Sequence, residues 1–178
     1  SSDLMENSEL DLLQAYRRAA SKTSEIAAVT EDMKAELGAG ANYPDLLPTL
    51  AQFEVALLDF MAENLGSSEY AVFADKCWPA FEAEFGFVPC YVNSRLAGRG
   101  IPVACEVDMY GAVSEYLAQL ASLKPATLLD INNSVPADVL PDGADLKGAT
   151  ARDLFMGFHC GNTASDCLTS CSMKYQLI

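Results

Sequence analysis

The chain has 178 residues, of which 51% are hydrophobic, and its 11 basic and 25 acidic side chains give a net charge of −14. This apolar content suffices for the core of one domain or of parts of two, whereas the negative charge repels the phosphates of nucleic acids and anionic membrane surfaces. No run approaches the ~20 apolar residues of a membrane span, and the sequence SSDLMENSELDLL lacks the features of a secretory signal. We therefore expect a cytoplasmic protein without nucleic-acid or membrane partners.

The two ends of the chain indicate a piece of a longer protein. The chain begins at Ser1 instead of a methionine. It ends in the sequence CSMKYQLI, where an apolar pattern starts instead of finishing. We therefore expect further parts of the fold to lie outside this chain.

Apolar residues at helical spacing predict three helices in residues 1–66. The first lies within residues 7–22, with Ser8 available as its N-cap. The second ends at Gly38, where a left-handed conformation suits glycine. The third, at residues 44–65, carries the longest apolar stripe. We expect all three helices to be outer layers that cover a sheet.

Beyond Ser68 the pattern changes to short apolar runs between turns, which is typical of strands that alternate with helices. The expected elements are a strand at 70–75, short helices in WPAFEAEFG and YVNSRLAGRG, a strand at 101–106, a helix in DMYGAVSEYLAQLASL and a strand at 126–131. The last three form a βαβ unit, whose strands should be parallel with a right-handed crossover. The predicted class is α/β, with a short parallel sheet covered by helices in a Rossmann-like layered domain.

A change in composition marks the start of a second domain. Residues 1–125 would form the α/β domain, and residues 126–178 would begin the next one. The sequence SVPADVLPDGADLKGAT is rich in Pro, Asp and Gly, as loops are, and a further strand follows in DLFMGFH. If the rest of this domain is missing, the strands after Asp130 should lack neighbours and the tail from Asn162 should be poorly anchored.

Three potential metal ligands close three apolar runs. Glu106 and Asp130 end the two strands of the βαβ unit, and His159 ends the run LFMGFH. Ligands bind at the carboxyl ends of parallel strands, so these side chains would meet at one edge of the sheet. Carboxylate oxygens and an imidazole nitrogen suit Mn²⁺, with Mg²⁺, Co²⁺ and Zn²⁺ as other possibilities. Two carboxylates there could also move protons, one as base and the other as acid.

Structural roles for these residues remain open at this point. An acid at a junction between strand and helix is commonly an N-cap, a role that Asp108 fits better than Glu106 does. Asp130 could cap a turn through its side chain. A single histidine after an apolar strand is more often structural than catalytic.

The cysteines suggest a competing site. His159, Cys160, Cys167 and Cys171 could hold a structural zinc ion, although their spacing departs from that of zinc knuckles. Cys77, Cys90 and Cys105 lie in or beside apolar runs, where a thiol behaves as a small buried hydrophobe. We expect all the cysteines to be reduced.

The motifs CWPAF, NSRLAGRGIPVACEVDMYGA, LLDINN and FHCGNT, in this order, resemble the central and early C-terminal parts of the L-fucose isomerase and L-arabinose isomerase superfamily. The resemblance spans roughly residues 70–163 and is most specific in its second motif. It implies a metal-dependent aldose–ketose isomerase of the ene-diol type, acting on a monosaccharide. Glu106 and Asp130 would hold Mn²⁺ and move the proton between C1 and C2, and His159 would complete the ligands.

The sequence also departs from that superfamily. Its members are several times longer and oligomeric, some use a second histidine, and the interval from Asp130 to His159 is shorter here. We therefore expect a fragment of a homo-oligomeric enzyme that is inactive, or nearly so, alone. The alternatives are a sugar-binding or scaffolding module that has lost catalysis and a structural zinc protein.

Overall fold

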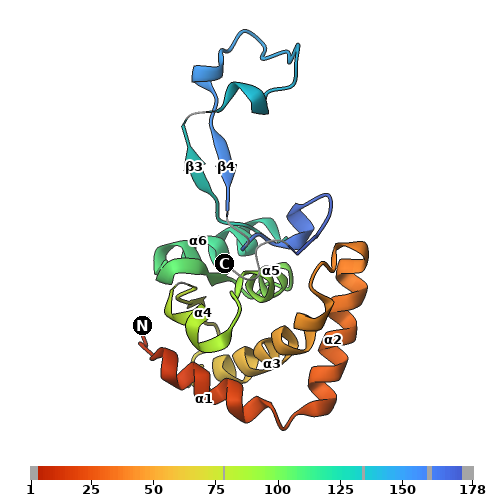
Figure 1. Cartoon of the computed structure of the whole chain (residues 1–178). Coiled ribbons are helices and arrows are strands. Elements are labelled where there is room, and N and C mark those ends of the chain that lie inside the picture. The colour runs from red at the N-terminus through yellow and green to blue at the C-terminus, as the bar shows by residue number, and fades with distance from the viewer. Residues whose placement is uncertain (1–3, 78, 134, 160–161, 174–178) are drawn as a thin grey trace.

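The computed structural model describes residues 4–77, 79–133, 135–159 and 162–173 of the chain (Figure 1). Its helices are α1 (Glu9–Ala19), α2 (Thr23–Leu37), α3 (Leu47–Asn64), α4 (Ala80–Phe85), α5 (Cys90–Gly98) and α6 (Met109–Ser122). Its strands are β1 (Phe73–Ala74), β2 (Val103–Ala104), β3 (Asp130–Asn132) and β4 (Met156–Phe158). The fold is α/β, with a short parallel sheet, and every predicted helix is present. Among the described residues, no helix has both the length and the hydropathy needed to span a bilayer.

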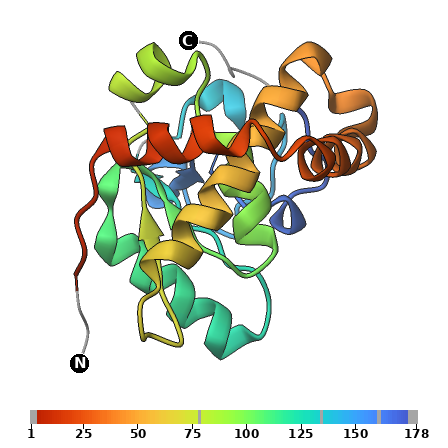
Figure 2. The same ribbon diagram turned by 90° about the horizontal axis from the view of Figure 1, so that it is seen from below.

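The helix ends follow the chemistry of their terminal residues. Ser8 begins α1 with a capping box, in which its hydroxyl accepts from the Asp11 N–H and the Asp11 carboxylate accepts from the Ser8 N–H at 3.0 Å. Gly38 ends α2 with φ 51°, as its position in the sequence predicted. α1 crosses α3, as the view from below shows (Figure 2).

α3 is a central helix, which the sequence did not indicate. It packs against α1, α2 and α5, and the expectation that it covers a sheet as an outer layer was wrong. Its buried residues are Leu47, Leu50, Ala51, Phe53, Glu54, Val55, Ala56, Leu57 and Met61. A helix that is apolar around most of its circumference is stable only when neighbours surround it.

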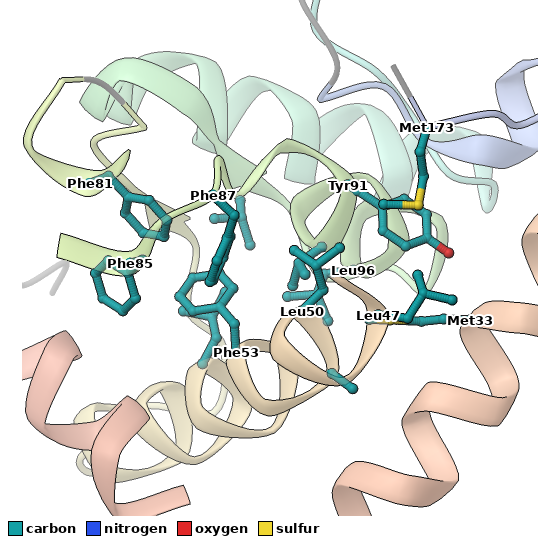
Figure 3. Packing of buried hydrophobic residues seen from close by; sticks show 14 of the residues in the cluster. Met33, Leu47, Leu50, Phe53, Phe81, Phe85, Phe87, Tyr91, Leu96 and Met173 are labelled. Carbon is teal, nitrogen blue, oxygen red and sulfur yellow. The ribbon is translucent and has the colours of Figure 1, made fainter. Parts of the chain in front are cut away.

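Four phenylalanines form the centre of the hydrophobic core (Figure 3). Phe81 and Phe85 stack with ring centroids 4.2 Å apart, because they lie one turn apart on α4. Gly86 has φ 76°, which turns the chain so that Phe87 faces the same cluster. Phe53 of α3 meets Phe81 edge-on at 5.2 Å. This cluster fixes α4 against α3.

Arg95 is the centre of a buried charge cluster that joins three helices. Its side chain is 1% exposed, and its Nε donates to Glu54 of α3 at 2.7 Å. Its other nitrogens pair with Asp32 and Glu36 of α2. Arg99 adds a second cation, 2.7 Å from Glu54 and 2.6 Å from Asp32. The two arginines at the C-terminal half of α5 and just after it therefore pair with acids on α2 and α3.

The strand pairing differs from the βαβ prediction. β2 pairs in parallel with β1, with Phe73 opposite Val103, whereas β3 pairs antiparallel with β4, with Asp130 opposite Phe158. The segment before β3 lies along α6 instead, where the buried Glu115 accepts from the Leu128 N–H. The edge of β2 that faces away from β1 is occupied by Asn162, whose Nδ2 donates to the Val103 carbonyl at 2.6 Å. The predicted parallel neighbour of β2 at residues 126–131 was therefore wrong.

The C-terminal segment is anchored to the helical body. β3 and β4 project away from the helices, and the loop between them lies at the far end (Figure 1). The chain then returns, so that the Thr163 carbonyl accepts from Ser94 and the Met173 N–H donates to the Gly40 carbonyl at 2.9 Å. Gly40 has no space for a side chain there, since a Cβ would overlap with the backbone of Cys171. The expectations of unpaired strands and of a poorly anchored tail were thus wrong for the described residues.

Replacing Arg95 by methionine should destabilise the protein by about 3 kcal/mol, because it leaves buried Glu54 with Arg99 as its remaining cation. The matched control Arg18→Met removes an exposed pair with Glu63 and should change stability by less than about 1 kcal/mol. Urea unfolding followed by circular dichroism measures both. Equal small losses would show that the cluster does not hold the helices together.

Candidate functional site

The carboxyl ends of β1 and β2 lie side by side because the strands are parallel. The Asp75 N–H donates to the Ala104 carbonyl at 2.9 Å, and the Val107 N–H donates to the Asp75 carbonyl at 2.9 Å. These two bonds continue the ladder past the strand ends. They bring Asp75 next to the turn that carries Glu106.

Glu106 projects from a strained turn. Residues Cys105–Val107 form a single 3₁₀ turn between β2 and α6, in which Glu106 has φ 58° and Val107 has φ 59°. The left-handed region is unfavourable for residues with a Cβ and especially for β-branched valine. The Glu106 side chain is exposed and makes no hydrogen bond or ion pair with the residues described here. The turn thus presents a carboxylate to solvent.

Asp108 caps α6, which confirms the preference for this residue over Glu106 as the cap. Its Oδ1 accepts from the Gly111 N–H at 2.8 Å. A Cβ at Gly111 would overlap with the Asp108 carboxylate and with the Leu128 side chain. The segment that leads to Asp130 therefore passes beside the first turn of α6, the same helix end that Glu106 precedes.

Asp130 and His159 lie at the same end of the second sheet, at the start of β3 and just after β4. Asp130 is exposed at the first position of β3, opposite Phe158, and His159 follows Phe158 directly. The half-buried His159 accepts from the Asn162 N–H through Nδ1 at 3.2 Å. A neutral imidazole with this bond carries its proton on Nε2. Binding of a metal ion through Nε2 would therefore need the other tautomer.

Glu106, Asp130 and His159 do not form one cluster in this structure. Within residues 4–77, 79–133, 135–159 and 162–173, no three His, Cys, Asp or Glu side chains are placed to hold a metal ion. The pairing of β3 with β4 places Asp130 opposite Phe158, the residue before His159, whereas Glu106 follows β2 in the other sheet. That these three residues form a site stays a prediction.

Asp75 is a candidate site residue that the sequence reasoning missed. Its Oδ2 accepts from Asn93 Nδ2 at 2.9 Å, while the buried Asp75 Oδ1 and Asn93 Oδ1 have no hydrogen-bond partner among the described residues. Burial raises the pKa of Asp75 to about 7. The run YAVFAD ends in an acid at a strand end, the same signal that identified Glu106. Asp75 could therefore have been identified from the sequence by the same signal.

Cys77 and Cys105 meet at the start of the Glu106 turn. Their Sγ atoms are 2.8 Å apart, and both residues are buried, as is Cys90. Burial raises the pKa of the Cys105 thiol. The prediction that these three cysteines lie in the core is confirmed. Of the alternative zinc ligands, Cys167 is exposed, Cys171 is half-buried and Cys160 lies outside the described residues.

Comparison with known proteins relates the chain to sugar isomerases. It is 25% identical over 111 residues to a sulfoquinovose isomerase of Priestia aryabhattai, a match that covers 61% of this chain and 24% of that protein. It is 33% identical over 79 residues to a sulfoquinovose isomerase of Alkalicoccus urumqiensis, which covers 44% of this chain and 17% of that protein. The matched region thus spans about a quarter or less of these relatives. No family model and no solved structure matches the chain.

These matches agree with the predicted class of protein, and the finer assignment to L-fucose and L-arabinose isomerases stays a prediction. The relatives are named as sugar isomerases, in accordance with the superfamily that the motifs resemble. None of the three carries the name of an L-fucose or L-arabinose isomerase.

Replacing Asp75 by asparagine should make stability less dependent on pH. The pKa of Asp75 in the folded state, about 7, exceeds the ordinary value of 3.8 for an aspartate, so the folded state binds more protons between these values and stability falls as pH rises from about 4 to 7. Asp75→Asn should remove this decline and stabilise the protein at pH 8, by on the order of 2 kcal/mol. Urea unfolding at several pH values measures the effect. An unchanged pH profile would show that Asp75 ionises normally in the fold.

Proposed function

We propose that the chain is part of a metal-dependent aldose–ketose isomerase of the ene-diol type. The observation that carries this proposal is the similarity to sulfoquinovose isomerases over 111 residues, 61% of the chain. Exposed acids at the strand ends support it, since Glu106 and Asp130 are open to a ligand from outside. As a piece that matches 24% of such a relative, this chain would need the remainder for full activity.

Glu106, Asp130 and His159 are the proposed ligands of Mn²⁺. Two carboxylates and an imidazole are a donor set that this ion accepts. Among the described residues, however, the three side chains are not gathered around one point, and His159 uses Nδ1 as an acceptor. The placement seen here therefore does not fit the ion, and we derive no step through it. The proposal requires Asp130 and His159 to approach Glu106 in the complete protein.

The acids themselves are the proposed proton carriers. An aldose and its ketose differ by a proton that moves between C1 and C2, so the reaction needs a base that can return the proton as an acid. Glu106 suits this role because the turn that carries it is fixed on the side that follows Glu106, at Val107 by Asp75 and at Asp108 by the α6 cap. A positioned acid–base group of this kind contributes about 10²- to 10⁴-fold to the rate.

The proposed substrate is a monosaccharide in its open-chain form. The relatives are named for sulfoquinovose, which makes this sugar the first to test, and L-fucose and L-arabinose follow from the sequence motifs. Cytoplasmic location remains part of the proposal.

Self-association of the complete protein is also proposed, and an uncharged face of α6 supports it. The exposed apolar residues on and just after this helix are Tyr110, Val113, Leu117, Leu120 and Leu123. The charged residue of α6, Glu115, is buried. In a chain with net charge −14, a face without exposed charge is where like molecules can approach.

In the complete protein, the exchange of Glu106 for glutamine or of Asp130 for asparagine should weaken Mn²⁺ binding about tenfold or more, because each removes one anionic ligand. The matched controls Glu84→Gln and Asp142→Asn change exposed acids elsewhere and should bind as the unaltered protein does. Calorimetric titration with MnCl₂ measures the affinities.

In the complete protein, Glu106→Gln should lower the rate of aldose-to-ketose conversion, followed by NMR, by about 10²-fold or more. Equal Mn²⁺ affinity in all four variants, together with an unchanged rate, would refute the proposed function.

A further inference from the structure

Two buried thiols are in contact at the carboxyl ends of the parallel strands. Cys77 follows β1 and Cys105 follows β2, and their Sγ atoms are 2.8 Å apart. Cys77 is 7% exposed and Cys105 is 5% exposed. No part of the proposed isomerase chemistry uses either thiol.

The fold holds these thiols close to the geometry of a covalent bond. A disulfide has an S–S length of about 2.05 Å, so the two sulfur atoms need to approach by less than about 1 Å. The backbone on either side is fixed by the pairing of Ala74 with Ala104 and by the two hydrogen bonds of Asp75. Closing the bond would therefore require no rearrangement of the sheet.

One thiol of the pair belongs to the residue next to the acid of the candidate site. Cys105 is the first residue of the strained turn whose second residue is Glu106. Movement of the Cys105 sulfur toward Cys77 pulls on this turn, which has left-handed conformations at both Glu106 and Val107. Because Glu106 is bonded directly to Cys105, a displacement of Cys105 would reach the backbone that carries the Glu106 carboxylate.

We propose that Cys77 and Cys105 form a reversible disulfide that couples the redox state of the surroundings to the position of Glu106. The formation of the disulfide is inferred only from the positions of the two sulfur atoms. Its effect on cation binding at Glu106 rests on the proposed function.

The oxidant is a small-molecule disulfide such as oxidised glutathione. One cysteine thiolate attacks a sulfur of this molecule, which forms a mixed disulfide and releases one small thiolate. The second cysteine thiolate then attacks the protein sulfur of the mixed disulfide and releases the other small thiolate. The two cysteines lose two electrons and two protons, and the small disulfide gains them as two thiols. A small dithiol reverses the reaction.

Access to the buried thiols is through the turn itself. Glu106 and Val107 are exposed, with Val107 51% accessible, so local opening of this turn uncovers Cys105 without unfolding the core. The reaction should therefore be slower than that of the exposed Cys167, which serves as an internal reference.

The test is oxidation of the 178-residue chain with oxidised glutathione, followed by alkylation, digestion without reductant and mass spectrometry. We expect a peptide pair linked through Cys77 and Cys105 that dithiothreitol separates. Cys77→Ser and Cys105→Ser should each abolish the linked pair and leave a glutathione adduct on the remaining cysteine. Cys90→Ser, a matched change at another buried cysteine, should leave the linkage intact. Alkylation of both Cys77 and Cys105 after oxidation, in a protein whose Cys167 has reacted, would overturn the proposal.

Two further measurements separate this inference from the proposed function. Oxidation should raise the midpoint of thermal unfolding by about 5 to 10 °C, because the bond closes a loop across a separation of 28 residues, and it should not do so in Cys77→Ser. In the complete protein, the oxidised and reduced forms should differ severalfold in Mn²⁺ affinity. Equal affinities would overturn the coupling to Glu106. Loss of Mn²⁺ binding in both forms would instead refute the proposed function, while the linked peptide still decides whether the disulfide forms.

Discussion

The pairing of Arg95 with Glu54 is the interaction on which the rest of the structure depends. Both side chains are 1% exposed, and an ion pair removed from water in this way is favourable only when its hydrogen bonds are complete. Asp32 and Glu36 complete those of Arg95, and Arg99 completes those of Glu54. α5 therefore has one favourable orientation against α2 and α3. Since β2 follows α5 after a short turn, the same pairing sets the position of the sheet.

The helices could be predicted from sequence because their signals are local. Apolar spacing and the terminal residues Ser8 and Gly38 suffice to define the first two helices, and the capping role of Asp108 follows from its place before α6. The strand pairing could not be predicted, because strands of two or three residues carry no information about their partners. The side chain of Asn162 takes the edge of β2, and Glu115 holds the segment before β3 on α6. Both contacts are long-range.

The candidate site combines what sequence can and cannot indicate. Glu106 could be identified because it ends an apolar run. The left-handed turn that carries Glu106 could not be predicted, because it contains no glycine. Asp75 and Cys77 become part of the same region only through the pairing of β1 with β2. A strained backbone persists where the surrounding contacts hold it in place. Here the hydrogen bonds of Asp75 and the Asp108 cap of α6 hold the turn.

The projecting arm of β3 and β4 affects how the molecule tolerates cleavage. The loop at the far end of the arm is distant from the helical body. The chain segments before β3 and after β4 both lie against the helices (Figure 1). The segment after β4 is bound through Asn162 on β2 and through Met173 at Gly40. A protease that cuts the loop would therefore produce two polypeptides that remain associated, and the nicked molecule would keep its fold until a denaturant separates them.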